Sequence, residues 1–298
     1  MTRYFVCTNP YSGSGKSKRS LQQVKSLFNQ QNIQADYVET QHAGHGKQIF
    51  QQLDFTSYTG MVVIGGDGSI HDAINGILTN ANANPPPLGF IAGGSGNSLM
   101  HDLQCLSVEQ AVNAILQGNT ASMDILALQL DNQRLYSFNI TGWGLISDIG
   151  IRSEKMRWLG ASRYTLATLI ELARLKFRRA QITVDGVSSY DVFTLISLCN
   201  TKHTGKAMCL APKAELSDGL VDCLIIRQAS RFTLLKFFPK VFNGTHVKAP
   251  VLDYQHIKTM QLKPQQPMTL LVDGEVVSEI NQLDVTVLPE KLTYFSHS

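Results

Sequence analysis

The chain has 298 residues, of which 43% are hydrophobic and 16% are charged. An average globular protein carries roughly 25% charged residues, so this composition favours a folded core and excludes extended disorder. Lysine and arginine total 26 against 23 acidic residues, a net charge of only +3. Nucleic-acid-binding proteins usually carry a larger basic excess, so we expect no nucleic-acid partner. At roughly 150 residues per domain, the length predicts about two domains.

Membrane-spanning and secreted proteins are also disfavoured. A spanning helix needs about 18 consecutive apolar residues, whereas apolar runs such as 61–64 and 192–199 are short and typical of buried strands. The N-terminal segment has no apolar stretch of the kind that a secretory signal requires. Five scattered cysteines, never spaced as CxxC, indicate reduced, buried thiols of a cytoplasmic protein: Cys7, Cys105, Cys199, Cys209 and Cys223.

The first third of the chain alternates strand and helix patterns. The predicted strands are 4–8, 35–39, 60–64 and 88–91, and the predicted helices are 17–31, 45–53, 70–78, 97–103 and 108–116. Repeated strand–helix units predict a doubly wound, three-layer α/β domain, which we assign to residues 1–122.

Strand patterns dominate after residue 123. The predicted strands are 125–130, 135–140, 181–184, 192–198, 220–226, 257–262, 268–272 and 283–287, and two helices are predicted at 164–177 and 232–242. Many short strands predict an antiparallel β-sandwich-like second domain over 123–298, whose last residues are candidates for a return to the first domain.

Three glycine-rich segments, 9–17, 65–69 and 93–98, each follow an apolar strand and lead into a helix. In open α/β folds ligands bind at the carboxyl ends of the strands, where these segments fall. Small residues before a helix leave backbone N–H groups available to a phosphate, and Lys16 adds a positive charge. Together the three segments indicate a nucleoside triphosphate site.

Each segment also has a simpler interpretation. The first is not a Walker A loop, because Pro10 stands where that motif needs glycine, and a flexible Ser/Gly loop is the alternative. In the second, Asp67 beside phosphates would act through a metal ion or as a base, whereas an Asp-Gly hairpin turn is disfavoured by the buried parallel strand before it. The third fits neither a Rossmann fingerprint nor a GxSxG elbow, because of Leu99 and Asn97.

These segments resemble motifs of the diacylglycerol kinase catalytic domain family, which also contains sphingosine kinases, ceramide kinases and bacterial lipid kinases. The similar segments are 9–10, 12–16, 65–68, 75–76 and 94–97 in the first domain, and 142–144, Asp148, 153–155, 157–160, 163–164, 218–222 and 273–275 in the second. The resemblance implies two domains with ATP in the cleft between them and a lipid held by the second.

The resemblance also implies roles for particular residues. The nucleotide would be bound by Asn9, Ser12, Gly13, Lys16 and Thr40, with its phosphates near Gly65, Gly66, Gly68, Gly94, Ser95, Gly96 and Asn97. Asp67 would be the catalytic acid–base residue or a Mg²⁺ ligand, and Arg157 and Arg163 would contact phosphates. Asp273 and Gly274 would close the nucleotide site from the second domain together with a catalytic Glu275, and Asp218 would hold a structural metal. The alternatives are a surface ion pair with Glu154 for the arginines and an ordinary Asp-Gly turn for Asp218.

One departure from the family pattern bears on the substrate. Sphingosine kinases carry an acidic residue, which pairs with the substrate's amine, two positions after the counterpart of Asp148. Here that position is Gly150, which has no charge. If Asp148 and Gly150 line the substrate site, a neutral lipid such as diacylglycerol or ceramide is favoured over a sphingoid base, unless another nearby acid replaces the missing one.

The segments 164–179 and 232–242 mix apolar and basic residues, as do helices that lie on anionic bilayers, although packing on a core is the alternative. We therefore predict an ATP- and Mg²⁺-dependent lipid kinase, cytoplasmic and transiently membrane-associated. Rival predictions are a sphingosine kinase proper, a kinase of soluble substrates resembling NAD kinase, and a non-catalytic binding protein. The sequence leaves open whether the chain is a monomer or a homodimer.

Overall fold

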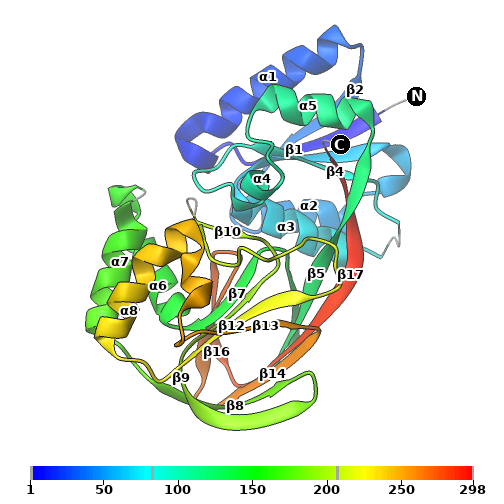
Figure 1. Ribbon diagram of the computed structural model, residues 1–298. Coiled ribbons are helices and arrows are strands. Elements are labelled where there is room, and N and C mark those ends of the chain that lie inside the picture. Colours follow the sequence, from blue (N-terminus) through cyan, green and yellow to red (C-terminus); the bar gives the residue numbers. More distant parts are fainter. Residues whose placement is uncertain (1–2, 82–83, 161, 206–207, 297–298) are drawn as a thin grey trace. The chain divides into compact units, whose positions relative to one another are not determined.

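The computed structural model describes residues 3–81, 84–160, 162–205 and 208–296, and the chain divides into two units (Figure 1). The first unit comprises Met1–Met123 with Glu290–Ser298, and the second comprises Asp124–Pro289. Strands β5 (Thr120–Leu130) and β17 (Leu283–Phe295) carry the chain from one unit to the other.

Strands and helices alternate in the first unit. In chain order they are β1 (Arg3–Thr8), 3-10 helix η1 (Ser12–Gly15), α1 (Lys16–Gln30), β2 (Gln34–Glu39), α2 (His45–Gln52), η2 (Phe55–Ser57), β3 (Gly60–Gly65), α3 (Asp67–Leu78), β4 (Leu88–Ala92), α4 (Ser98–Asp102) and α5 (Val108–Gln117).

The four strands form a parallel sheet in the order β4-β3-β1-β2, and the end of β17 joins β4 in parallel. Strand β3 is buried along its whole length, as expected of a continuous apolar run covered on both faces. Residues alternate along β1, so Val6 packs with Val24 of α1, while the ring of Phe5 meets that of Phe50 of α2 at 5.7 Å. Helices α1 and α5 therefore cover one face and α2 and α3 the other, which makes three layers (Figure 1).

The second unit consists mainly of strands. Apart from β5 and β17, its elements are β6 (Gln133–Ser137), β7 (Ile140–Gly144), α6 (Leu145–Glu154), η3 (Arg157–Leu159), α7 (Ser162–Ala173), β8 (Arg178–Val184), β9 (Val187–Cys199), β10 (His203–Thr204), β11 (Met208–Cys209), β12 (Val221–Arg227), α8 (Arg231–Phe237), η4 (Phe238–Asn243), η5 (Thr245–Lys248), β13 (Asp253–Ile257), β14 (Thr259–Pro264), β15 (Met268–Val272) and β16 (Glu275–Ile280).

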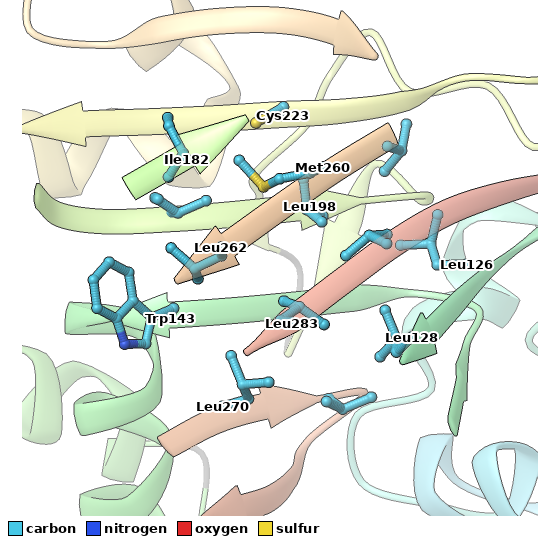
Figure 2. Packing of buried hydrophobic residues seen from close by; sticks show 14 of the residues in the cluster. Leu126, Leu128, Trp143, Ile182, Leu198, Cys223, Met260, Leu262, Leu270 and Leu283 are labelled. Atoms are coloured by element: carbon cyan, nitrogen blue, oxygen red, sulfur yellow. The ribbon is translucent and has the colours of Figure 1, made fainter. Parts of the chain in front are cut away.

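The strands of this unit pair antiparallel, in the order β16-β15-β7-β9-β8-β14-β17, with β12 and β13 continuing from β9. Their inward side chains form an apolar core, in which Figure 2 shows Trp143, Met260, Leu262 and Leu270 among others. The predicted fold class, an α/β domain followed by a β-sandwich-like domain, is confirmed.

The second unit differs from the prediction in several details, of which two concern the segment around β7. The strand predicted over 135–140 is two strands, β6 and β7, and helix α6 was not predicted at all. Helix α6 contains Ile146, Ile149 and Ile151 around Gly150, residue types with modest or poor helix propensity, so its pattern resembles that of a strand.

The five cysteines are all free. Four are buried and Cys209 is half-buried. Burial raises the pKa of the Cys7 and Cys199 thiols to about 12, so both stay protonated at neutral pH. Neither is poised as a nucleophile, since the thiolate is the reactive form.

Candidate active site

The three glycine-rich segments follow neighbouring strands of the first unit's sheet. Strand β1 pairs with β3 up to Thr8 and Ile64, and β3 pairs with β4 up to Gly65 and Ala92, so all three strands end at the same edge. Backbone hydrogen bonds continue across that edge, from the Asn9 N–H to the Ile64 carbonyl at 3.2 Å. The sheet therefore brings together the three segments that sequence analysis selected.

The segments contact one another through their backbones. A Cβ on Gly13 would lie 2.2 Å from the carbonyl oxygen of Gly93, and one on Gly94 would lie 2.4 Å from the Cα of Gly66. Real Cβ atoms do not approach other atoms so closely, so glycine is required at both positions for steric reasons. The close packing explains why the glycines recur at three separate points of the sequence.

The first segment turns tightly into helix α1. Gly13 and Gly15 both have positive φ, 59° and 90°, a conformation that glycine adopts without strain. The residue before α1, Gly15, has no side chain that could cap the helix, and the first residue of α1 is the exposed Lys16. Uncapped N–H groups and the positive end of the helix dipole together attract an anion. Thr40 lies beside this segment, because its N–H donates to the carbonyl of Thr8 at 2.9 Å.

The second and third segments are joined by the carboxylate of Asp67. Asp67 is the first residue of α3, and its two oxygens accept hydrogen bonds from the N–H of Ser98 at 2.8 Å and from its hydroxyl at 3.2 Å. The carboxylate thus caps helix α4, which begins at Ser98. Asn97 closes the third segment on itself, through Oδ1 with the Gly94 N–H at 2.9 Å and through Nδ2 with the Gly94 carbonyl at 3.0 Å.

The predicted substrate residues Asp148 and Gly150 lie on helix α6 in the second unit. Both oxygens of Asp148 accept hydrogen bonds from Arg178 of β8, at 2.8 and 2.7 Å. Gly150 is buried, and a Cβ there would lie 2.6 Å from Cδ1 of Leu271. The side chain next to position 150 is therefore the apolar Leu271. Asp148, the acidic residue that we predicted near the substrate, forms an ion pair with Arg178.

The predicted phosphate-binding arginines follow α6. Arg163 lies 3.8 Å from the carboxylate of Glu154, donates to the hydroxyl of Tyr164 at 2.8 Å and stacks over that ring. The ion pair that we considered as the alternative role of Arg163 is thus present, and it also fixes the position of the guanidinium. The backbone of Arg157 begins η3, but its side chain lies outside the described part of the structure.

Asp273 and Gly274 form the turn between β15 and β16, with φ of 52° and 97°. Asp273 is only 4% exposed, and its carboxylate accepts hydrogen bonds from the N–H groups of residues 138–140 and from the hydroxyl of Ser137 at 2.7 Å. The side chain therefore ties this turn to the connection between β6 and β7. Glu275 begins β16 and is exposed. A contact of these residues with a nucleotide stays a prediction.

Asp218 accepts a hydrogen bond from the N–H of Leu220 at 3.0 Å, as in an ordinary Asp-Gly turn. The next glycine, Gly219, donates its N–H to Asp124 at 2.7 Å. Among the described residues, no group of three or more His, Cys, Asp or Glu side chains could hold a metal ion. The metal at Asp218 therefore stays a prediction.

Three contacts of the selected residues were not predicted: Ser98, although it lies in the third segment, was not paired with Asp67, and Arg178 and Leu271 were not placed at the site. Each contacts a candidate residue that is 31, 30 or 121 positions away in the sequence. Serine, arginine and leucine are common, and their local patterns predict ordinary helix or strand positions. Only the fold could identify them.

Two family models match the chain. The model of the diacylglycerol kinase catalytic domain matches residues 3–128, and that of the YegS C-terminal NAD kinase beta sandwich-like domain matches residues 142–296. The second match alone covers more than half of the chain.

Curated relatives and solved structures are similar along nearly the whole chain. Sphingosine kinase 1 of Arabidopsis thaliana is 28% identical over 88% of this chain and 64% of its own length. Diacylglycerol kinase of Mycobacterium tuberculosis is 27% identical over 86% of this chain and 83% of its own length. The chain thus spans less than two thirds of the Arabidopsis relative. A diacylglycerol kinase from Bacillus anthracis has the same fold, with a TM-score of 0.74 at 17% identity, over 99% of this chain and 97% of that one.

Proposed function

Because the chain belongs to the family that joins a diacylglycerol kinase catalytic domain to a YegS-type C-terminal domain, we propose that it is an ATP-dependent lipid kinase. The observation that carries the proposal is the Asp67 carboxylate, fixed among three glycine segments at one sheet edge. Such an edge supplies donors for phosphate oxygens and a single base, which together suit phosphoryl transfer.

In this proposal the nucleotide lies along the sheet edge of the first unit. Asn9, Ser12, Gly13, Lys16 and Thr40 surround it on the side of β1 and β2. The phosphates lie beside the second and third segments, at Gly65, Gly66, Gly68, Gly94, Ser95, Gly96 and Asn97, where small residues let a ligand approach the backbone closely. The uncapped start of α3 supports this placement, since its N–H groups favour an anion.

Asp67 is the proposed base of the reaction. The primary hydroxyl of the lipid attacks the γ-phosphorus in line, a new oxygen–phosphorus bond forms, and the bond to the β-phosphate oxygen breaks to release ADP. The hydroxyl proton passes to the Asp67 carboxylate and from there to solvent. Two hydrogen bonds from Ser98 fix the carboxylate in position, and positioning is a large part of the rate enhancement in such reactions.

Mg²⁺ is compatible with this donor set when it arrives with the nucleotide. The ion typically takes one or two carboxylates together with substrate phosphates and waters, and Asp67 supplies a carboxylate at the sheet edge. When bound, Mg²⁺ would neutralise the negative charge of the phosphates. The protein's part is to hold the Asp67 carboxylate at the start of α3.

Arg163 and Arg157 are proposed to bind phosphoryl oxygens. Guanidinium groups suit this role because they bind phosphate with two parallel hydrogen bonds. Glu154 and Tyr164 hold Arg163 in place and therefore act as positioning residues. We keep Glu275 as a further candidate for the reaction, since it is exposed next to the rigid turn of Asp273 and Gly274.

We propose a neutral lipid as the substrate. A sphingoid amine needs an unpaired carboxylate, but Asp148 is paired with Arg178 on both oxygens, and Leu271 lies against Gly150. A cation desolvated beside Leu271 without a partner would be costly. Diacylglycerol and ceramide carry a primary hydroxyl without an amine, so both remain candidates.

The same proposal places the enzyme in the cytoplasm and, transiently, at a membrane surface, because its substrate is a bilayer lipid. None of the helices in the described part of the chain is long and apolar enough to cross a membrane.

ATP turnover with different acceptors tests the proposal. We expect ADP release to increase when lipid–detergent micelles are added and to stay at the basal level with NAD. Stimulation by NAD alone would favour the soluble-substrate kinase. Tight ATP binding without turnover under any condition would favour a binding protein.

Replacement of Gly94 by alanine is expected to lower turnover about 10²-fold, because a shift of about 1 Å at the reacting groups has an effect of this size. The new methyl would meet the Cα of Gly66 at 2.4 Å, and neither backbone can retreat without moving Asp67. Gly118→Ala is the control, since φ there is 74° but no atom lies within 4 Å of the added Cβ. That variant should lose about 1 kcal/mol of stability and keep its activity. Equal turnover in the two variants would contradict the assignment.

A further inference from the structure

Helix α8 and the following η4 carry exposed apolar and basic side chains. We call the set formed by Phe232, Leu235, Lys236, Lys240 and Phe242 the α8–η4 surface. We propose that this surface docks on an anionic lipid bilayer. Docking would bring the proposed lipid kinase to its substrate, so the role of the surface rests on the proposed function.

The apolar members of the α8–η4 surface face solvent. Phe232 is 79% exposed, Leu235 42% and Phe242 46%. In a helix, residues spaced three and four apart share a face, so Phe232, Leu235 and Lys236 lie together. The opposite face, with Leu234 and Phe237, is buried in the unit's second apolar cluster. The exposed face of helix α8 therefore carries large apolar side chains among basic ones, whereas a helix that only covers a core has a polar outer face.

The outer face is held rigidly by what lies beneath it. Val241 is buried between the exposed Lys240 and Phe242, and the rings of Phe238 and Phe242 meet edge to face at 5.4 Å. His246 is fully buried, with Nε2 2.8 Å from the Leu210 carbonyl oxygen and its ring against Phe237. The exposed aromatic side chains are thus presented on a fixed frame and need little ordering when they bind.

The segment that carries the surface is basic. Residues 223–252 contain none of the chain's 23 acidic residues but five of its 26 basic ones, although the whole chain has a net charge of only +3. Arg227 is paired with Asp191 and Asp253. Within the described part of the chain, the other four form no ion pair: Arg231, Lys236, Lys240 and Lys248.

Exposed aromatic groups beside uncompensated lysines fit the interface of a bilayer with anionic headgroups. The apolar side chains would enter the headgroup boundary, and the lysines would meet lipid phosphates and carboxylates. A contrasting site shows that exposure alone is insufficient. Val187 and Tyr190 on β9 are 75% and 63% exposed, but residues 180–201 contain no lysine or arginine, so that strand has no basic side chain to meet anionic headgroups.

Flotation with phosphatidylcholine vesicles, with and without phosphatidylserine, tests the apolar part of the proposal. We expect the protein to float with the phosphatidylserine vesicles, and Phe232→Ser to weaken this binding about tenfold. Because Phe232 is exposed, the substitution should leave the thermal stability unchanged. Tyr190→Ser is the matched control and should bind like the unmodified protein.

A second pair of variants tests the charge. Each basic side chain near an anionic membrane contributes about fivefold to binding, so Lys236→Gln with Lys240→Gln should weaken it about 25-fold. Lys258→Gln with Lys263→Gln removes the same charge from exposed positions outside the surface and should change binding less than twofold. Raised salt should weaken vesicle binding by the unmodified protein more than vesicle binding by the Lys236/Lys240 variant.

The outcomes separate the docking surface from the enzymatic proposal. Failure of the unmodified protein to bind vesicles, equal binding by surface and control variants, or a loss caused only by Leu169→Ser on α7 would overturn the docking proposal. Phosphorylation of lipid dispersed in detergent micelles should be the same in all of these variants. Absence of that activity together with normal vesicle binding would refute the kinase proposal and leave the docking surface in place.

Discussion

Asp67→Asn is expected to lower the turnover number about 10³-fold, within the usual range for loss of a general base. The amide cannot take up the proton of the lipid hydroxyl, yet its oxygen can still accept the hydrogen bond from the Ser98 N–H. The fold should therefore survive, with a loss of about 1 kcal/mol because the hydrogen bonds with Ser98 no longer involve a charged group. Micelle-based kinase assays and thermal unfolding measure the two effects.

Glu109→Gln provides the control for charge. Glu109 lies in the first turn of α5, as Asp67 does in α3, but it is exposed and remote in sequence from the glycine segments. Both substitutions remove a carboxylate from a helix start, which costs about 0.3–1 kcal/mol. Turnover in Glu109→Gln should equal that of the unmodified protein. Retained activity in Asp67→Asn would remove Asp67 from the mechanism.

Asp273→Ala should have the largest effect on stability, about 4 kcal/mol, because several buried donors lose their acceptor at once. The N–H groups of residues 138–140 and the hydroxyl of Ser137 all donate to this carboxylate. For a unit of this size the midpoint of thermal unfolding should fall by about 10 °C. Calorimetry of the whole chain would follow the transition.

Glu275→Ala is the control for the stability loss in Asp273→Ala, because it shows whether any substitution near this turn destabilises the protein. Glu275 lies two residues further on but is exposed, so its replacement should change stability by less than about 0.5 kcal/mol. A small stability loss in Asp273→Ala, similar to that in Glu275→Ala, would show that the hydrogen bonds of Asp273 contribute little. A loss of ATP affinity without a loss of stability would instead support its predicted contact with the nucleotide.

The α/β unit was predictable because its signals are local. Strand β3 is a short apolar run and α5 carries a Ser107/Gln110 capping box with Gly118 at its end, so each element is marked within its own residues. The proximity of the three glycine-rich segments was predictable for a related reason, because segments that follow adjacent parallel strands lie at the same edge of the sheet.

The second unit was less predictable because long-range packing determines its elements. Helix α6 has a strand-like composition, and it packs against β15, which lies far along the chain. Strand β16 is largely exposed and lacks a strong apolar alternation, so it was not predicted. The pairing of Asp148 with Arg178 likewise depends on contact between α6 and the start of β8.

The most direct test of the account is transfer of radiolabelled phosphate from ATP to lipids in detergent micelles. The acceptors would be diacylglycerol, ceramide, monoacylglycerol and sphingosine, each assayed with the unmodified protein and with Asp67→Asn. The account predicts a labelled product from a neutral lipid, little or none from sphingosine, and about 10³-fold slower labelling with the variant. Labelled sphingosine as the main product would contradict the substrate proposal, and absence of any labelled lipid would contradict the assignment as a lipid kinase.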